Sequence, residues 1–463
     1  MATSTPLDQA AGSRLASEFG GQLISPADGG YDEARKVYNG MIDRRPGLIA
    51  RCADGGDVAA AVDFARREGV LVSIRGGGHN AGGLGVCDDG LVIDLSPMRD
   101  IEVDPGAKTV RVQGGATWGE VDRATHAHGL AVPSGIISTT GVGGLTLGGG
   151  IGHLSRKHGL TIDSLLSVDM VLADGTSVTA SEDQNEDLFW AVRGGGGNFG
   201  AVTSFQFRGN PVHTVLAGPM FWPLEQTEEA LRFYDEFIAG APEDVNGFFA
   251  FLTVPPADPF PAELHMRKVC GVVWCCTGDL EEAEQAMRPA REFGPPLLDG
   301  VQPMPFPDIQ SAFDELYPSG LQWYWKADFV DELPDEAVAA HAEHGAQLPS
   351  MHSTMHLYPI DGAVHRVGSD ETAFAYRDSR WAEVIVGVDP DPANAAAITD
   401  WTRRYWEALH PHSAGGAYVN FLMHDEGGER VKATYRGNYD RLVEVKRRYD
   451  PDNLFRVNQN IAP

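Results

Sequence analysis

The chain has 463 residues, with 36 lysines and arginines against 65 aspartates and glutamates, a formal net charge of −29. Proteins that bind duplex DNA or RNA need a basic surface, and anionic membranes attract basic segments, so this charge excludes both kinds of partner. A single hydrophobic core rarely grows this large, so the length predicts two domains, or one domain that carries a large insertion.

Cysteine usage and the N-terminal sequence both point to a reducing compartment. The five cysteines are an odd number, two of them are adjacent, and no pair has the spacing of a zinc site. Residues 1–20 have neither the basic region nor the apolar core of a signal peptide, and no run of about 18 apolar residues occurs. We therefore expect a cytoplasmic protein without a membrane span.

The first half of the chain alternates helices and strands. We expect Asp57 to cap a helix that Gly69 ends, because a carboxylate accepts the free amides of a first turn and glycine adopts the left-handed conformation after the last. In chain order we expect a helix over 58–67, strands over 70–74, 91–95 and 109–112, and a helix over 117–128.

The second half continues the mixture after a crossing point at residues 211–223. We expect helices over 225–239 and 280–292, strands over 247–254, 269–276 and 322–328, and a helix over 438–446. Mixed helices and strands in both halves predict an α+β protein.

Glycine, with 55 residues, gathers in three runs at 75–83, 141–152 and 194–200. Such loops offer unhindered backbone N–H groups and can cradle a phosphate. A P-loop is excluded because no run is followed by Lys-Ser or Lys-Thr, and a Rossmann turn is only partly matched because residues 84–90 look turn-like. A flavin pyrophosphate cradle in a different fold is the third interpretation, and it also accounts for His79.

The run Arg-Gly-Gly-Gly-His-Asn-Ala-Gly-Gly at 75–83 resembles the flavin-attachment loop of the vanillyl-alcohol oxidase superfamily, also called the p-cresol methylhydroxylase type. In its berberine-bridge-enzyme branch, the histidine of this motif is bonded to the 8α-methyl carbon of the flavin. The resemblance implies that His79 is the attachment residue, and a neutral imidazole is a competent nucleophile near pH 7. Residues 141–152, 187–196 and 438–461 resemble the second and third flavin loops and the closing segment of the family.

Two departures from the family pattern bear on the flavin. Many relatives make a second flavin bond from a cysteine just before the second loop, but residues 135–141 contain no cysteine, so we expect FAD held by a single covalent link. Leu145 stands where berberine-bridge-type members often carry a histidine. Besides His79, the flavin contacts implied by the resemblance are Arg75, Gly76, Gly77, Gly78, Asn80, Gly82, Gly141, Gly143, Gly144, Gly148, Gly149, Gly152, Gly200, Val202, Asn438, Asn458 and Asn460.

The resemblance also implies the architecture. A two-part FAD-binding domain of the p-cresol methylhydroxylase type would span residues 1–212, with its pyrophosphate loop at 75–83, and be completed by residues 423–463. An α+β substrate domain at 213–422 would be inserted between the two parts, with an antiparallel sheet over the flavin.

Oxidation of an alcohol or amine removes a hydride from carbon and a proton from oxygen or nitrogen, so a general base must reach that proton. Alternation in residues 417–421 predicts a strand that points Tyr418 and Asn420 the same way, and it resembles a Y-x-N segment that brings a catalytic tyrosine to the flavin. We expect Tyr418 to be the base and Tyr376 to be its partner or a substrate contact. A tyrosine that only packs its ring is the alternative for each.

Two further groups of side chains are candidates for a substrate or metal site. Trp323 and Trp325 would share one face of a strand, where they could cover an aromatic substrate or simply pack. His352 and His356 lack an evident third ligand, so no metal is expected.

The implied activity is that of an FAD-dependent oxidase of secondary metabolism, which passes hydride from an alcohol or amine carbon to flavin N5 and is reoxidised by O2 to give hydrogen peroxide. An alkaloid-like amine, a phenolic natural product or a sugar alcohol would be its substrate. The alternatives are a dehydrogenase with another electron acceptor, a non-catalytic flavin- or ligand-binding protein, and a nicotinamide-dependent reductase. We expect a monomer or a homodimer.

Overall fold

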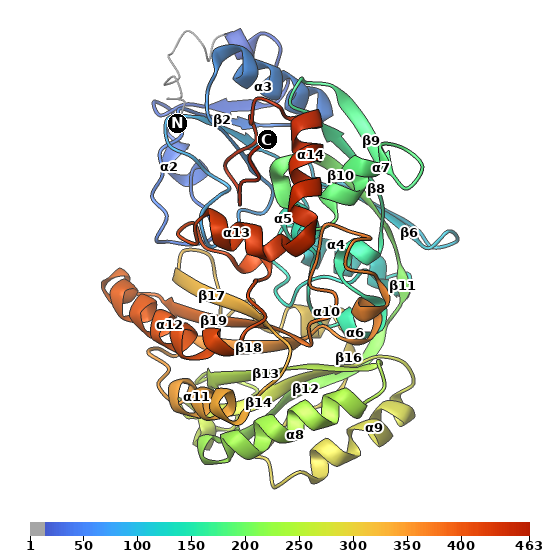
Figure 1. Cartoon of the computed structure of the whole chain (residues 1–463), viewed down its shortest axis with the longest axis vertical. Coiled ribbons are helices and arrows are strands. Elements are labelled where there is room, and N and C mark those ends of the chain that lie inside the picture. Colours follow the sequence, from blue (N-terminus) through green and yellow to red (C-terminus); the bar gives the residue numbers. More distant parts are fainter. Residues whose placement is uncertain (1–13) are drawn as a thin grey trace.

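The computed structural model describes residues 14–463 and has two tiers (Figure 1). The upper tier holds both ends of the described part of the chain and two smaller sheets, and the lower tier is built on one large sheet (Figure 1). Within the described residues, no helix is both long and apolar enough to cross a membrane.

The first sheet of the upper tier has four strands in the order β1-β2-β4-β3, with β2, β4 and β3 parallel. Its strands are β1 (Gln22–Ile24), β2 (Leu48–Arg51), β3 (Val72–Arg75) and β4 (Leu91–Asp94), and helix α3 (Gly55–Glu68) joins β2 to β3. The helix ends at Gly69 as predicted, where φ is +67°. The predicted start at Asp57 is wrong, because Asp54 is the cap and accepts the Asp57 amide at 3.0 Å, while the Asp57 carboxylate accepts the amides of Gly20 and Ala53 instead.

The second sheet has five antiparallel strands in the order β5-β6-β10-β8-β9. They are β5 (Ile101–Asp104), β6 (Thr109–Gln113), β8 (Leu165–Val171), β9 (Ser177–Ser181) and β10 (Ala201–Arg208). The helices of this part are α2 (Tyr31–Ala34), α4 (Trp118–His126), α5 (Val142–Gly148), α6 (Ser155–His158) and α7 (Glu186–Val192), and two short strands, β7 (Leu130–Ala131) and β11 (Asn210–Pro211), pair with each other.

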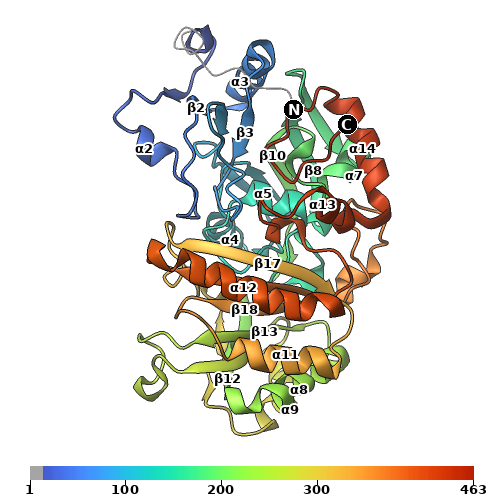
Figure 2. The same ribbon diagram turned by 60° about the vertical axis from the view of Figure 1, so that its left-hand side comes forward.

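The large sheet of the lower tier is antiparallel and has the strand order β15-β12-β14-β13-β18-β19-β17, with β16 paired to β12. Its strands are β12 (Thr214–Pro223), β13 (Val245–Thr253), β14 (Lys268–Cys276), β15 (Leu298–Asp299), β16 (Gln302–Pro305), β17 (Gln322–Val330), β18 (Thr354–Pro359) and β19 (Trp381–Asp389). Four helices cover the face away from the upper tier, namely α8 (Thr227–Gly240), α9 (Leu280–Glu292), α11 (Asp335–Gly345) and α12 (Ala395–Leu409) (Figures 1 and 2). The opposite face of the sheet looks toward the flavin loops. The helices and strands predicted for this half are confirmed.

The end of the chain returns to the upper tier (Figure 1). Helices α13 (Gly428–Tyr435) and α14 (Tyr439–Tyr449) lead into a tail that the buried Lys446 ammonium fixes in place. This ammonium donates to the carbonyls of Asn198 (2.7 Å) and Phe455 (2.9 Å) and pairs with Asp450 (2.6 Å). Lys446 thereby ties the tail to the third glycine run. The predicted boundary at 212 falls between β11 and β12, and the one at 422 lies before α13.

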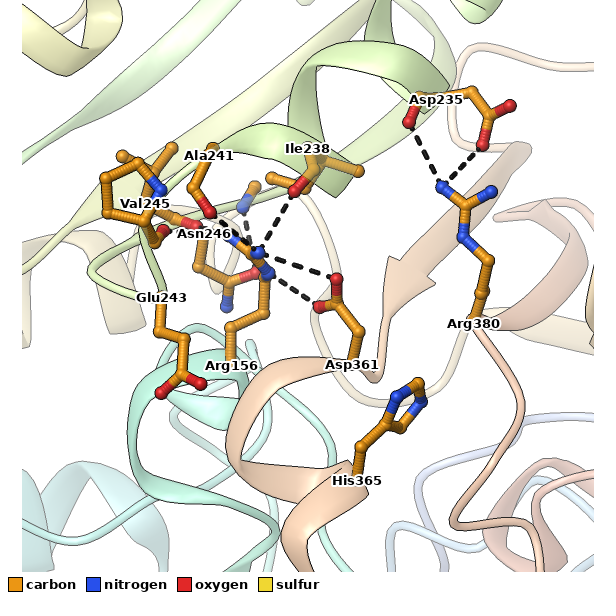
Figure 3. A network of polar contacts seen from close by, with 12 residues as sticks. Arg156, Asp235, Ile238, Ala241, Glu243, Val245, Asn246, Asp361, His365 and Arg380 are labelled. Atoms are coloured by element: carbon orange, nitrogen blue, oxygen red, sulfur yellow. Dashed lines mark hydrogen bonds and ion pairs between the residues drawn. The ribbon is translucent and has the colours of Figure 1, made fainter.

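One buried arginine joins the two tiers (Figure 3). Arg156, on α6, donates to the carbonyls of Ile238 (3.0 Å) and Ala241 (3.2 Å) at the end of α8, and its Nε lies 2.6 Å from the Asp361 carboxylate. It also donates to the carbonyls of Pro242 and Val245. A guanidinium suits this place because the last carbonyls of a helix lack partners and carry partial negative charge. The large sheet is therefore held at a fixed position against the flavin loops.

A buried acid lies where α4 meets the short helix α10 (Phe306–Gln310). The Gln310 amide donates to Asp122 Oδ2 at 3.3 Å, but Asp122 Oδ1 and Gln310 Oε1 are both buried without a hydrogen-bond partner. Burial raises the pKa of Asp122 from 3.8 to about 7. A protonated carboxyl would supply the donor that the Gln310 oxygen lacks.

Asp122 makes the stability of the fold depend on pH. Because its pKa is higher in the folded state than in the unfolded chain, the stability that Asp122 contributes is present in full below about pH 4 and is lost as the pH rises through about 7. We expect Asp122→Asn to unfold at a higher temperature than the parent at pH 8 and to show a smaller fall between pH 5 and pH 8, measured by thermal unfolding. Asp308→Asn, which changes an exposed acid of α10, is the control. An equal pH dependence in the parent and in Asp122→Asn would contradict this prediction.

Candidate active site

A cavity of about 330 Å³ lies between the upper tier and the large sheet. The glycine loops and the C-terminal tail form its upper walls, and strands β17, β18 and β19 form its floor. Residues from both ends and the middle of the chain therefore meet in one enclosure.

The first and second glycine runs touch through their backbones. A Cβ atom on Gly77 would lie 2.6 Å from the Cα of Gly141, and one on Gly141 would lie 2.4 Å from the Gly77 nitrogen. Gly78 follows with φ of +67°, a conformation that L-residues with side chains rarely adopt. The close approach of the two loops requires glycine at 77 and 141, and the positive φ favours it at 78, whether or not a ligand is bound.

His79 directly follows the three glycines of the 75–83 loop, and its imidazole is half-buried. The Tyr38 ring stacks on it with centroids 3.6 Å apart, and Thr139 Oγ1 lies 3.1 Å from Nε2. Desolvation lowers the pKa of His79 to about 3. The imidazole is therefore neutral at physiological pH and keeps an available nitrogen lone pair.

The lining of the cavity suits a flavin dinucleotide. Val72, Leu95 and Val202 are apolar lining residues suited to a flat base, and the glycine loop offers exposed backbone suited to a pyrophosphate. A Cβ atom on Gly144 would meet no other atom within 4 Å, so the backbone there is open to whatever fills the cavity. His79 and Tyr418 also line the cavity.

Most of the predicted flavin contacts line this cavity. Those that do are Arg75, Gly76, Gly77, Gly78, His79, Asn80, Gly141, Gly143, Gly144, Gly200, Val202 and Asn458. The Arg75 guanidinium is engaged by Asp94 at 2.9 Å, so this residue contributes its backbone and stem to the wall.

Six predicted flavin contacts lie outside the lining: Gly82, Gly148, Gly149, Gly152, Asn438 and Asn460. The Asn438 amide is occupied by backbone carbonyls, the nearest being that of Ser369 at 2.7 Å. Gly152 lies against the backbone of Ser134, where a Cβ would come within 2.0 Å of the carbonyl oxygen. Asn438 and Gly152 therefore support the walls from behind and do not face the cavity.

Tyr418 and Asn420 come together in the cavity, but they do so on a turn. The predicted strand is wrong, because residues Val419–Phe421 form a 3-10 turn that begins after Tyr418. Five residues cannot distinguish a repeat of two from a repeat of three, and here Tyr418 and Phe421 pack with ring centroids 4.8 Å apart. The Tyr418 oxygen accepts hydrogen bonds from Asn420 Nδ2 and from the Gly150 amide, both at 2.7 Å.

The end of the second glycine run makes room for this pair. A Cβ on Gly148 would lie 2.3 Å from Asn420 Oδ1, and Gly149, with φ of +135°, lies beside the Tyr418 ring. Gly148 and Gly149 therefore position the side chains that face the flavin site.

Tyr376 does not reach the cavity, which contradicts its predicted role. Its hydroxyl donates to the Ala433 carbonyl at 3.1 Å, and its ring stacks on Phe329 with centroids 4.3 Å apart. The Arg436 guanidinium covers the other face at 3.6 Å. Tyr376 is a packing residue between the large sheet and α13.

The comparisons with known proteins agree with this geometry. Residues 46–181 match the FAD binding domain family and residues 417–462 match the family described as berberine and berberine like. An FAD-linked oxidoreductase of Bacillus subtilis is 32% identical over 96% of this chain and 97% of its own length. One from Dictyostelium discoideum is 30% identical over 92% of this chain and 91% of its own length.

This chain belongs to the berberine-bridge-like family of FAD-linked oxidoreductases. The crystal structure of 6-hydroxy-D-nicotine oxidase from Arthrobacter nicotinovorans is similar to it with a TM-score of 0.85 and 26% identity, over 96% of this chain and 98% of that one. The predicted family, the α+β fold and the identification as an FAD-linked enzyme are thereby confirmed.

In this family member the floor of the cavity is largely aromatic. Trp323 and Trp325 share one face of the strand as predicted and line the cavity, while Tyr324 and Lys326 point to the other side, where they contact Asp425 and Glu426. Strand β18 adds Thr354, His356 and Tyr358 at alternate positions. The sequence showed this alternation at residues 354–358, but nothing in it marked the strand as facing a ligand.

Tyr38, Tyr317 and Gln459 also line the cavity and were not predicted. Gln459 lies in the closing segment that the sequence marked, but Tyr38 and Tyr317 belong to no motif, and only the folded chain brings the three together. His356 lines the cavity without a neighbouring histidine ligand, and within residues 14–463 no group of three or more His, Cys, Asp or Glu is arranged to hold a metal ion.

The contact between the glycine loops predicts the effect of one methyl group. We expect Gly77→Ala to lose most of its bound FAD, because the added Cβ would force the 75–83 and 141–152 loops apart. Flavin absorbance per polypeptide in the purified protein measures this. Gly428→Ala, which starts α13 and meets nothing within 4 Å, is the matched control and should keep its full FAD content. Full loading of Gly77→Ala would contradict the constraint.

Proposed function

We propose that the protein is an oxidase that holds FAD by a single covalent bond, from the His79 imidazole to the flavin 8α-methyl carbon. It removes a hydride from an alcohol or amine carbon of a small organic substrate, while a base takes the proton from oxygen or nitrogen. Transfer of the two electrons and two protons to O2 gives hydrogen peroxide, so the overall reaction balances. The bound flavin would supply the two-electron acceptor, and the protein supplies position and proton transfer.

The observation that carries the proposal is the neutral His79 imidazole at the wall of a cavity shaped by glycine loops. A protonated imidazole has no free lone pair, so the lowered pKa of His79 favours bond formation. The five cysteines are all buried, and none belongs to the cavity lining found among residues 14–463. A second flavin bond from cysteine therefore has no donor.

Tyr418 is the base in this proposal. Its oxygen accepts two N–H hydrogen bonds, at 2.7 Å each, and no acceptor for its own proton lies among residues 14–463. Two donors aimed at one oxygen stabilise a phenolate, as an oxyanion hole stabilises an alkoxide. Burial acts in the opposite direction and raises the pKa of Tyr418, so the active form is favoured by alkaline pH.

The relatives support the reaction class. (R)-6-hydroxynicotine oxidase of Paenarthrobacter nicotinovorans is 29% identical over 96% of this chain, and xylooligosaccharide oxidase of Thermothelomyces thermophilus is 30% identical over 92% of it. Both are named as oxidases of small molecules, one an alkaloid and the other a sugar. The five free thiols support a reducing, cytoplasmic location, and we propose a monomer or homodimer that acts in secondary metabolism.

His79 is tested by the fate of the flavin on denaturation. We expect acid precipitation of the parent protein to carry yellow flavin down with the polypeptide, because the bond to His79 survives unfolding. His79→Ala should release it to the supernatant, whereas His128→Ala, which changes an exposed histidine, should retain it. Free flavin from the parent protein would contradict the covalent link.

Tyr418 is tested by the pH dependence of flavin reduction. Since the base must be deprotonated and burial raises its pKa, kcat/KM should rise toward alkaline pH. Tyr418→Phe should lose this rise and about 10²-fold or more in the rate of flavin reduction, with its FAD content unchanged. The same alkaline rise in Tyr418→Phe would exclude Tyr418 as the base. Turnover with a dye acceptor but not with O2 would assign the enzyme to the dehydrogenases.

A further inference from the structure

The floor of the cavity carries a set of aromatic rings that we call the aromatic wall: Trp323, Trp325, His356, Tyr358 and Phe421. Trp325 and Phe421 have centroids 5.9 Å apart, and Tyr358 and Phe421 have centroids 6.1 Å apart. These rings lie on or beside the large sheet, opposite the flavin loops. A flat, apolar ligand can pack on such a surface without leaving polar groups unpaired.

The cavity has almost no formal charge. Arg75 is the only Lys, Arg, Asp or Glu residue in the lining found among residues 14–463, and its guanidinium is paired with the buried Asp94 carboxylate at 2.9 Å. His356 is neutral because burial lowers its pKa to about 3. A charged group of a ligand would have to leave water without a counterion, which costs several kcal/mol. Contact with aromatic ring faces returns about 2 kcal/mol to an ammonium group, less than this cost, so the lack of a counterion in the cavity disfavours both ammonium and carboxylate groups.

The hydrogen bond between His356 and Tyr358 determines which ring nitrogen faces the cavity as a donor. His356 Nδ1 lies 2.7 Å from the Tyr358 hydroxyl, and no other acceptor for this hydroxyl proton lies among the described residues. Because a phenol is the better donor and a neutral imidazole nitrogen the better acceptor, Tyr358 donates to Nδ1. The remaining proton of the imidazole is then on Nε2.

His356 Nε2 has no protein partner within residues 14–463 and is not among their fully enclosed polar atoms. The neighbouring Thr354 hydroxyl already donates to the Phe251 carbonyl at 2.7 Å, and the Asn420 amide donates to Leu145 and Tyr418. The indole Nε1–H groups of Trp323 and Trp325 also lack partners but are fully enclosed, so the Nε2–H of His356 is the free donor that is open on the sheet side of the cavity.

We propose that the substrate is an uncharged aromatic alcohol whose ring packs on the aromatic wall and whose acceptor oxygen receives a hydrogen bond from His356 Nε2–H. This inference rests on the proposed function, in which Tyr418 takes the proton of the oxidised group. It names His356 as the residue that determines specificity. An alkylammonium would find no counterion in this cavity. A polyhydroxylated sugar would lose hydrogen bonds that it makes in water.

The test compares ligands of one size that differ in polarity. Acetophenone has an acceptor oxygen, ethylbenzene has none, and 1-phenylethylammonium carries a charge. Ligand-observed NMR titration of the flavin-loaded enzyme gives their dissociation constants without requiring turnover. We expect acetophenone to bind about tenfold more tightly than ethylbenzene, which corresponds to one neutral hydrogen bond, and the ammonium to bind more weakly than both. Equal or tighter binding of the ammonium, or no binding of acetophenone, would overturn the proposal.

Variants of His356 assign the preference to its Nε2–H. His356→Phe should lower the affinity for acetophenone to that for ethylbenzene and leave the latter unchanged, while His356→Gln, which keeps an N–H donor, should recover it within about threefold. Met355→Leu, on the opposite face of β18, is the control for the strand. An unchanged acetophenone-to-ethylbenzene ratio in His356→Phe would overturn the assignment.

The proposed function can fail separately. Loss of yellow colour on acid denaturation, or absence of hydrogen peroxide, would contradict the covalent oxidase. The ratio of ligand affinities would still report the polarity of the cavity.

Discussion

The flavin site depends on a contact between two backbone segments that only glycine allows. Gly77 and Gly141 approach so closely that a Cβ on either one would overlap the other loop. This contact places His79 beside Thr139, at the junction of the two loops. The position of the imidazole is thus fixed by the backbone on one side and by the Tyr38 ring on the other.

The cavity also requires that the large sheet stay in register with these loops. Arg156 binds carbonyls at the end of α8 and the Asp361 carboxylate, and Lys446 binds the third glycine run and the tail. Both cations are buried and surrounded by acceptors; Arg156 restricts the relative position of the tiers, and Lys446 holds the tail against the upper-tier glycine loops. Although the chain has a net charge of −29, the aromatic floor of the cavity bears no charged residue.

The sequence predicted those parts of the site that follow from local pattern. The glycine runs, His79 and the alternation of Trp323 and Trp325 were all visible in single segments. A glycine needed for a side chain looks the same in sequence as one needed for a ligand, so Gly148 was assigned to the flavin although it makes room for Asn420. Tyr38 and His356 reach the cavity only through long-range packing, which no local pattern records.

Mapping the flavin onto the polypeptide tests the central claim most directly. The purified protein would be digested with a protease, and the yellow peptides would be identified by mass spectrometry. We expect one flavin-bearing peptide, which contains residues 75–83, with the added mass on His79. Flavin on another residue, or on two residues, would contradict the single link, and the absence of any flavin-bearing peptide would contradict covalent attachment altogether.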